Sequence, residues 1–165
     1  MPQAEGLFSD LISQWEKDFP GEDSSPIAIA MRLRHLYLLD QASLEEVLVA
    51  FDIGIGEVDV LTHLRHQSPP YRLRPSDLAE LCMVTTGAIT GRITRLEDKG
   101  FVERVPSLSD KRTVYVQMTE SGEKLLRETR VQVARSSHFL DGIRSLSAPE
   151  RVRLDRLLAK LIQVL

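Results

Sequence analysis

The chain has 165 residues, of which 42% are hydrophobic and 27% charged, with a net charge of −3 at pH 7. This composition is typical of one globular domain with extensions and excludes a disordered or fibrous chain. A single cysteine, Cys82, excludes an intramolecular disulfide and any multi-cysteine metal site. No apolar run approaches the roughly 20 residues of a membrane span, and the N-terminus lacks the basic start of a secretory signal. We therefore expect a cytoplasmic protein without a membrane segment.

Charge is distributed unevenly along the chain. Residues 1–63 hold 3 Lys/Arg against 12 Asp/Glu, a net of −9, whereas residues 64–116 hold 9 against 6, a net of +3. Residues 117–165 also hold 9 against 6. A local excess of cations is what contact with nucleic-acid phosphates requires, although ordinary scatter explains an excess of this size equally well.

The N-terminal third is predicted to be helical. Apolar residues at helical spacing predict a short helix over 7–19, which holds the only tryptophan and needs a surface to dock on. A polar linker leads to a heavily apolar helical stretch over 27–51. Ser43 and Glu46 have the spacing of a capping box, so this stretch is either one bent helix or two. Its wide apolar stripe indicates a dimer interface.

A further helix is predicted over 57–67, capped by Gly54 or Gly56. His63 and His66 lie three residues apart in it, a spacing that places both on one face. A metal site needs further ligands at fixed positions, and none is evident. We therefore interpret the two histidines as packed or solvated, and we expect no metal.

The most informative stretch begins with a short helix at Pro75 and a tight turn. The helix predicted next, over 85–99, buries one stripe and leaves a small, hydroxylic face opposite it. Gly100 ends this helix, because that C-terminal position favours a residue that tolerates positive φ. Two short strands follow, over 101–104 and 113–118.

A charged loop that ends Asp110-Lys111-Arg112 joins the two strands. The order short helix, turn, helix, strand, basic loop, strand is that of a winged helix-turn-helix, which reads double-stranded DNA. After it, Thr119 caps a long amphipathic helix over 120–144, and Ser147 caps the last helix, over 149–165. The leucine-rich face of the last helix must be covered, most simply by the same elements of a second subunit.

Residues 69–119 resemble the DNA-binding region of the MarR (multiple antibiotic resistance regulator) family of winged helix-turn-helix transcriptional regulators. Asp110-x-Arg112, at its distance behind a glycine-capped helix, is the most specific part of the match. The other matching features are Leu78-Ala79, Gly87-Ala88-Ile89-Thr90, Arg95-Leu96-Glu97, Gly100-Phe101-Val102, Arg104, and Met118-Thr119 with Gly122.

The resemblance implies a mainly α fold with a small β-hairpin wing. It implies N-terminal dimerisation helices over 1–50, a winged helix-turn-helix DNA-binding domain over 55–118, and C-terminal dimerisation helices over 119–165. The expected partners are a second copy of the chain and a pseudo-palindromic operator in double-stranded DNA, which would associate the protein with the nucleoid. Many such proteins are repressors released by a small aromatic or anionic effector.

We expect neither a cofactor nor enzymatic activity. The sequence contains no Ser-His-Asp order, P-loop, HExxH motif or dinucleotide fingerprint. The alternative to a DNA-binding regulator is a winged-helix module that binds protein. Cations in both the helix and the wing favour DNA, because a pure interaction module has no need of them in both places.

Side chains on the exposed face of the 85–99 helix are predicted to meet the DNA. Threonine offers a hydroxyl to a base or phosphate and a methyl to thymine, whereas glycine lets the backbone approach closely. Arg92 is the best candidate for a bidentate guanine or phosphate contact. Arg95 is equally well interpreted as a brace for the wing, with Asp110 orienting it or Arg112. The candidate DNA-binding residues are Arg74, Thr85, Thr86, Gly87, Thr90, Gly91, Arg92, Arg95, Lys111 and Arg112.

An effector site is predicted less specifically. Its candidates are His35, Tyr37, His63 and His66, each of which is equally well interpreted as a surface residue. Peroxide-sensing members of the family use a cysteine near the N-terminus. Cys82 is instead interpreted as a small buried apolar residue, so we do not expect redox sensing.

Overall fold

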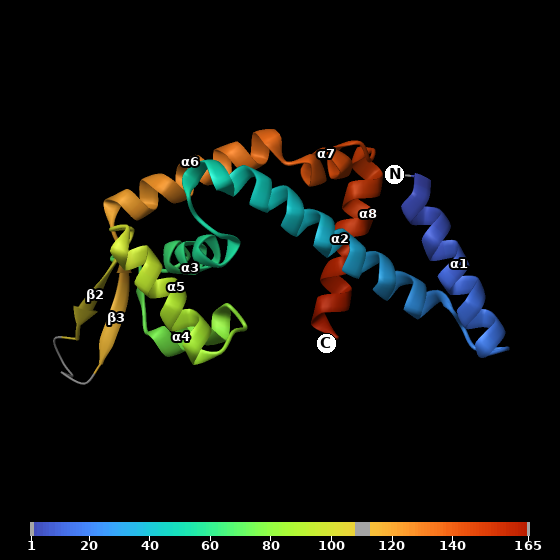
Figure 1. Ribbon diagram of the computed structural model, residues 1–165, viewed down its shortest axis with the longest axis horizontal. Helices are drawn as coiled ribbons and strands as arrows, with labels where there is room; N and C mark the ends of the chain where they lie inside the picture. Colours follow the sequence, from blue (N-terminus) through green and yellow to red (C-terminus); the bar gives the residue numbers. More distant parts are fainter. Residues whose placement is uncertain (1, 108–112, 165) are drawn as a thin grey trace. The chain divides into compact units, whose positions relative to one another are not determined.

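The computed structural model describes residues 2–107 and 113–164. They form a mainly helical chain with one small antiparallel sheet, as expected (Figure 1). The chain divides into two compact units, residues 1–42 and residues 43–165. In the described residues, no helix has the length and apolar character that crossing a bilayer demands.

The first unit contains α1 (Pro2–Asp18) and most of α2 (Ser25–Leu48). Helix α1 begins five residues before the predicted start at residue 7. Phe8 is buried, and its ring packs edge-on against that of His35 with 5.2 Å between centroids. The guanidinium of Arg32 lies 5.9 Å from the same ring centroid. An aromatic contact thus joins the two helices, which gives α1 its docking surface.

Helix α2 is continuous, so the stretch over 27–51 is not two α-helices. It ends at Leu48 and passes into a 3-10 turn, η1 (Val49–Phe51). The predicted cap at Ser43 is wrong, because Ser43 lies inside α2 and is buried. Its hydroxyl instead lies 3.0 Å from that of Ser137, where either oxygen can donate.

The second unit contains the winged helix. Three helices come first: α3 (Ile55–Arg65), α4 (Pro75–Leu81) and α5 (Thr86–Asp98). The sheet has the order β1-β3-β2, with β1 (Arg72–Leu73), β2 (Val102–Pro106) and β3 (Val114–Met118). Helix α3 packs against both α5 and α6 (Glu120–Ser136), so it lies at the centre of this winged-helix lobe. The fully buried side chains include Val60, Leu61, Leu64, Leu78, Ile89, Ile93, Leu96 and Val116.

Local chemistry sets the ends of these helices, as predicted for Gly54, one of two candidate caps, and for Gly100. Gly54 is the N-cap of α3, and its N–H donates to Oε2 of Glu57 at 2.8 Å. The hydroxyl of Thr85 accepts from the N–H of Ala88 at 3.3 Å and so caps α5. Gly100 has φ +72°, which confirms the left-handed residue expected behind α5.

Strand β1 was not predicted. Its two residues lie between Pro70 and Pro75, where the sequence predicts no element, and only their pairing with β3 makes them a strand. The register places Arg72 opposite Gln117 and Leu73 opposite Val116. This short strand attaches the segment that precedes α4 to the base of the wing.

The single helix predicted over 120–144 is wrong, because it is two helices, α6 (Glu120–Ser136) and α7 (His138–Arg144). Ser137 leaves the helical conformation at ψ 113°, and its hydroxyl accepts from the N–H of Leu140 at 3.3 Å. The last helix is α8 (Ala148–Gln163), and none of its residues is buried. Its exposed apolar side chains are Val152, Leu154, Leu157, Leu158, Leu161 and Ile162.

Candidate nucleic-acid interface

Helix α5 turns its small and hydroxylic residues to solvent, as the sequence predicts. Thr86, Gly87 and Thr90 are exposed, whereas the opposite stripe is buried in the core of the lobe. The hydroxyl of Thr90 donates to the carbonyl of Thr86 at 2.7 Å. This bond occupies the hydroxyl proton and leaves the oxygen lone pairs and the methyl group available to a partner.

The glycines of α5 are not required by the packing of the lobe. A Cβ built on Gly87 meets no atom within 4 Å. A Cβ on Gly91 meets only Nη1 of Arg95, at an ordinary 3.5 Å. Glycine inside a helix costs about 1 kcal/mol relative to alanine, so the fold alone favours alanine at both positions. Close approach of a binding partner to the helix backbone explains the two glycines better than the packing of the lobe does.

Arg92 does not extend from the exposed face of α5. Its side chain is 22% exposed and turns toward α3, where Nη1 lies 3.5 Å from the carbonyl oxygen of Gly56. The same nitrogen lies 4.0 Å from Oδ2 of Asp59. A Cβ on Gly56 would collide with the guanidinium, so this glycine makes room for the arginine. In this structure Arg92 joins α5 to α3.

The surroundings of Arg92 shift two titrating groups. Burial raises the pKa of Asp59, while the charges of Arg92 and then His63 oppose that rise. Burial, and next the charge of Asp59, raise the pKa of the Cys82 thiol, against the opposing effect of Arg92. A thiol with a raised pKa is a poor nucleophile at neutral pH, which agrees with a packing role for Cys82, but the residue is half-buried and not buried as expected.

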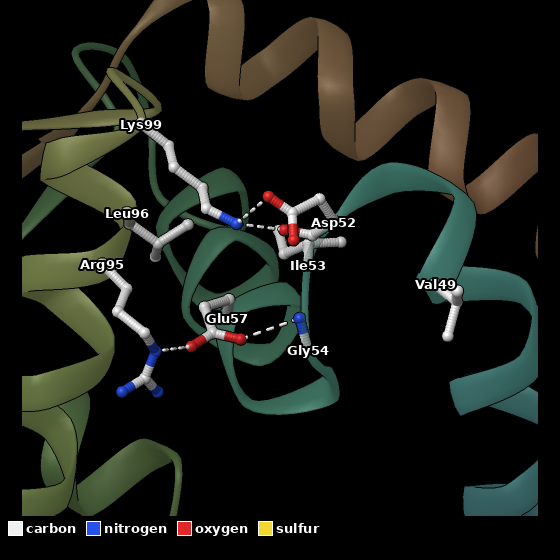
Figure 2. A pocket seen from close by; sticks show the side chains of 8 residues that line it. All are labelled: Val49, Asp52, Ile53, Gly54, Glu57, Arg95, Leu96 and Lys99. Atoms are coloured by element: carbon white, nitrogen blue, oxygen red, sulfur yellow. Dashed lines mark hydrogen bonds and ion pairs between the residues drawn. The ribbon is translucent and has the colours of Figure 1, made fainter.

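Arg95 is also tied to α3, through Nε 2.5 Å from Oε1 of Glu57 (Figure 2). Its expected role as a brace is therefore directed at α3 and not at the wing among the residues described. Arg104 of β2 makes the corresponding tie to the wing, with Nη1 2.5 Å from Oε2 of Glu97 and Nη2 3.4 Å from the hydroxyl of Thr94. Sequence reasoning matched Arg104 to the family pattern but gave it no role.

A hollow of about 360 Å³ lies beside this tie, between the end of α5 and the start of α3 (Figure 2). Lys99 crosses its rim, with Nζ 2.8 Å from Oδ2 of Asp52. None of the four effector candidates lines it. His35 and Tyr37 belong to the first unit, whereas in the second unit His63 lies on α3 and His66 is the C-cap residue that follows it. The lining residues are Val49, Asp52, Ile53, Gly54, Glu57, Arg95, Leu96 and Lys99.

Of the wing and cation candidates outside α5, Arg74 lies among the described residues and the others do not. Arg74 is the N-cap of α4, and its backbone N–H donates to Oδ2 of Asp77 at 3.3 Å, which leaves its exposed side chain outside the cap. Asp110, Lys111 and Arg112 lie outside the described residues.

Within residues 2–107 and 113–164, no three His, Cys, Asp or Glu side chains gather as a possible metal site.

One exposed cation, Arg72, is not among the candidates predicted from the sequence. Arg72 of β1 is exposed, and its guanidinium lies 4.9 Å from the ring centroid of Tyr115 on β3. The alternation Arg72-Leu73-Arg74 was a usable signal, because period-two spacing in a strand places both arginines on one face.

Comparison with known proteins finds a matching family model and several similar chains. The family model described as "MarR family" matches residues 54–114. The transcriptional regulator PecS of Dickeya dadantii (strain 3937) is 30% identical over 152 residues, which are 92% of this chain and 90% of that one. The multiple antibiotic resistance protein MarR of Escherichia coli (strain K12) is 32% identical over 119 residues, 72% of this chain and 80% of that one. A crystal structure of a mutant Escherichia coli MarR complexed with operator DNA has 28% identity and a TM-score of 0.71, covering 85% of this chain and 99% of that one.

Proposed function

This chain belongs to the MarR family, and from that premise we propose that it is a sequence-specific DNA-binding transcriptional regulator that acts as a homodimer on a pseudo-palindromic operator. Its relative PecS is a transcriptional regulator, and a solved structure of a mutant MarR holds operator DNA. The absence of enzymatic activity is part of the proposal.

The observation that carries the proposal is the exposed face of α5. It presents two threonines and a glycine to solvent, and a second glycine at its edge has no packing reason to be glycine. Such a face suits the major groove, where a recognition helix must approach base edges closely. We assign base contacts to Thr86, Gly87, Thr90 and Gly91, with Thr85 fixing the start of the helix.

Phosphate contacts are assigned to three cations outside the sequence of α5. They are Arg74, Lys111 and Arg112. Substitution of Arg112 by alanine should weaken binding at every sequence and lower the salt slope by about one. Arg92 and Arg95 act first as braces between α5 and α3, because both are engaged there in the free protein.

A second copy of the chain explains the exposed leucines of α8. A helix whose apolar residues are all exposed is stable in water only when another surface covers it. A two-fold pair of such helices presents two winged lobes to the same side of DNA, which matches the symmetry of a palindromic site. In this proposal residues 1–50 and 119–165 form the dimer, and residues 55–118 bind DNA.

Repression and its release by a small aromatic or anionic effector complete the proposal. They rest on family membership and not on a site in this chain. A thermal-shift screen of phenolic and aromatic acids tests them: a stabilising compound should also lower affinity for the operator. If every stabilising compound leaves DNA binding unchanged, the effector part is wrong.

The DNA-binding proposal is tested with the full chain and a pool of random duplexes. Bound duplexes are selected over several rounds, and fluorescence anisotropy then compares the enriched duplex with a scrambled one at low and high salt. We expect enrichment of an inverted repeat, bound more tightly than the scrambled control. Equal and weak binding to both duplexes at low salt would favour the alternative, a winged-helix module for protein partners.

A further inference from the structure

The outer face of the sheet carries a row of polar and aromatic side chains. Because neighbouring strands share one alternation, the residues that pair across β1, β3 and β2 point to the same side. The register pairs Arg72 with Gln117 and Gln117 with Glu103. Tyr115 is two residues before Gln117 on β3, so it shares their face and is the diagonal neighbour of Arg72.

Two guanidinium groups lie over the ring of Tyr115. That of Arg72 is 4.9 Å from the ring centroid, and that of Arg74 is 5.9 Å from it. Both distances are within the range of about 6 Å over which an aromatic face attracts a cation. Two like charges normally repel each other. The attraction of both guanidinium groups to one ring opposes this repulsion and holds together two flexible side chains that would otherwise separate.

No carboxylate neutralises this pair among the described residues. Glu103, the acidic residue of the same face, instead accepts from Nε2 of Gln117 at 3.1 Å. Asp77 accepts from the backbone N–H of Arg74 and forms no ion pair with its guanidinium. Both arginines are exposed. Two adjacent cations are thus held in place with their charge uncompensated, as a phosphate site requires.

We propose that Tyr115 is a positioning residue that holds Arg72 and Arg74 as a paired phosphate contact at the base of the wing. The inference rests on the proposed function, and its partner is the sugar-phosphate backbone of the operator duplex. The two arginines bind phosphate oxygens, while the ring reduces the side-chain entropy that they lose on binding. Strand β1 is what brings Arg72 to the wing, so this contact depends on the element that the sequence did not predict.

The test measures the salt dependence of binding to the enriched duplex for the full chain and its variants. Arg72→Gln should lower the slope of log K against log salt by about one, since one phosphate contact releases about 0.9 counterion. Tyr115→Phe keeps the ring and should retain the parent slope and affinity. Tyr115→Leu should lower the slope and weaken binding several-fold, roughly as for removal of one of the two arginines. Lys99→Gln, which removes a cation already paired with Asp52 within the lobe, is the matched control and should leave the salt slope at the parent value.

A tyrosine that serves only the packing of the sheet gives a different pattern. In that case Tyr115→Leu lowers the melting temperature and leaves the salt slope at the parent value, which overturns the inference. An unchanged slope for Arg72→Gln overturns it as well, whether or not Tyr115→Leu folds. In the Arg72→Gln, Arg74→Gln background, Tyr115→Leu should have no further effect on affinity. Failure of the parent chain to prefer its duplex contradicts the proposed function itself, so the two failures are distinguishable.

Discussion

Arg95 of α5 lies with Nε 2.5 Å from Oε1 of Glu57, a carboxylate whose side chain is only 11% exposed. The other oxygen of Glu57 accepts from the N–H that begins α3. One buried carboxylate therefore caps α3 and fixes the orientation of α5 (Figure 2). This relationship gives Arg95 a structural role that is independent of any contact with DNA.

Removing Arg95 should destabilise the lobe, because Glu57 would keep its burial and lose its cation. We expect Arg95→Ala to lower the free energy of unfolding by about 1–3 kcal/mol. The same substitution should cost less in a Glu57→Gln background, because the buried negative charge is already absent there. Urea unfolding of both single variants and the double variant measures their coupling, expected at roughly 0.5–3 kcal/mol. Strict additivity would show that the two side chains do not support each other.

Replacing the glycines of α5 should separate folding from DNA binding. Gly91→Ala meets only ordinary contacts, so it should raise stability by up to about 1 kcal/mol. If the partner backbone approaches closely there, the added methyl should at the same time weaken operator binding. Gly87→Ala should behave alike. Melting temperature and duplex affinity are measured on the same samples, and a stabilised variant with parental affinity would mean that glycine is merely tolerated.

Gly122 supports the wing from α6, and its substitution should be severe. A Cβ there would clash with the carbonyl oxygen of Phe101, and this backbone atom cannot move away as the end of a flexible side chain can. Gly122→Ala should therefore cost about 1–3 kcal/mol of stability. Gly142→Ala is the matched control, because that helical glycine of α7 has nothing within 4 Å of the added carbon. Its expected change is a gain of about 0.5–1 kcal/mol, and equal effects at the two sites would contradict the packing argument.

Asp59 should make stability depend on pH. Burial raises its pKa in the folded state above the ordinary value of 3.8, so the folded protein holds this proton more tightly than the unfolded chain. The stabilising contribution of the protonated form is present below that ordinary value and is lost as pH rises through the folded pKa. Asp59→Asn should flatten this part of the curve. Thermal unfolding of both proteins from pH 3.5 to about 6 tests it, and parallel curves would contradict the assignment.

The winged helix could be predicted from the sequence because its signals are local. The buried stripe of α5, the cap at Thr85 and the positive φ of Gly100 all depend on residues within a few positions of one another. Strand β1 and the break at Ser137 depend instead on distant partners. Arg72 needs β3 to become a strand residue, and the hydroxyl of Ser137 meets that of Ser43 from 94 positions away.

The site shows the same division. Exposure of Thr86, Gly87 and Thr90 follows from helical periodicity, so their placement was predictable. The engagement of Arg92 with Gly56 and of Arg95 with Glu57 was not, because a charged side chain at the margin of a helix can turn either way. Tertiary contacts with α3 determine the direction of both.

Protection of operator DNA from hydroxyl radicals tests the central claim most directly. A homodimer that places two α5 helices in successive major grooves should protect two half-sites of the enriched duplex, with centres about 10 base pairs apart. The protection should disappear from a duplex in which both half-sites are scrambled. Protection of one half-site alone, or of both duplexes equally, would contradict the account.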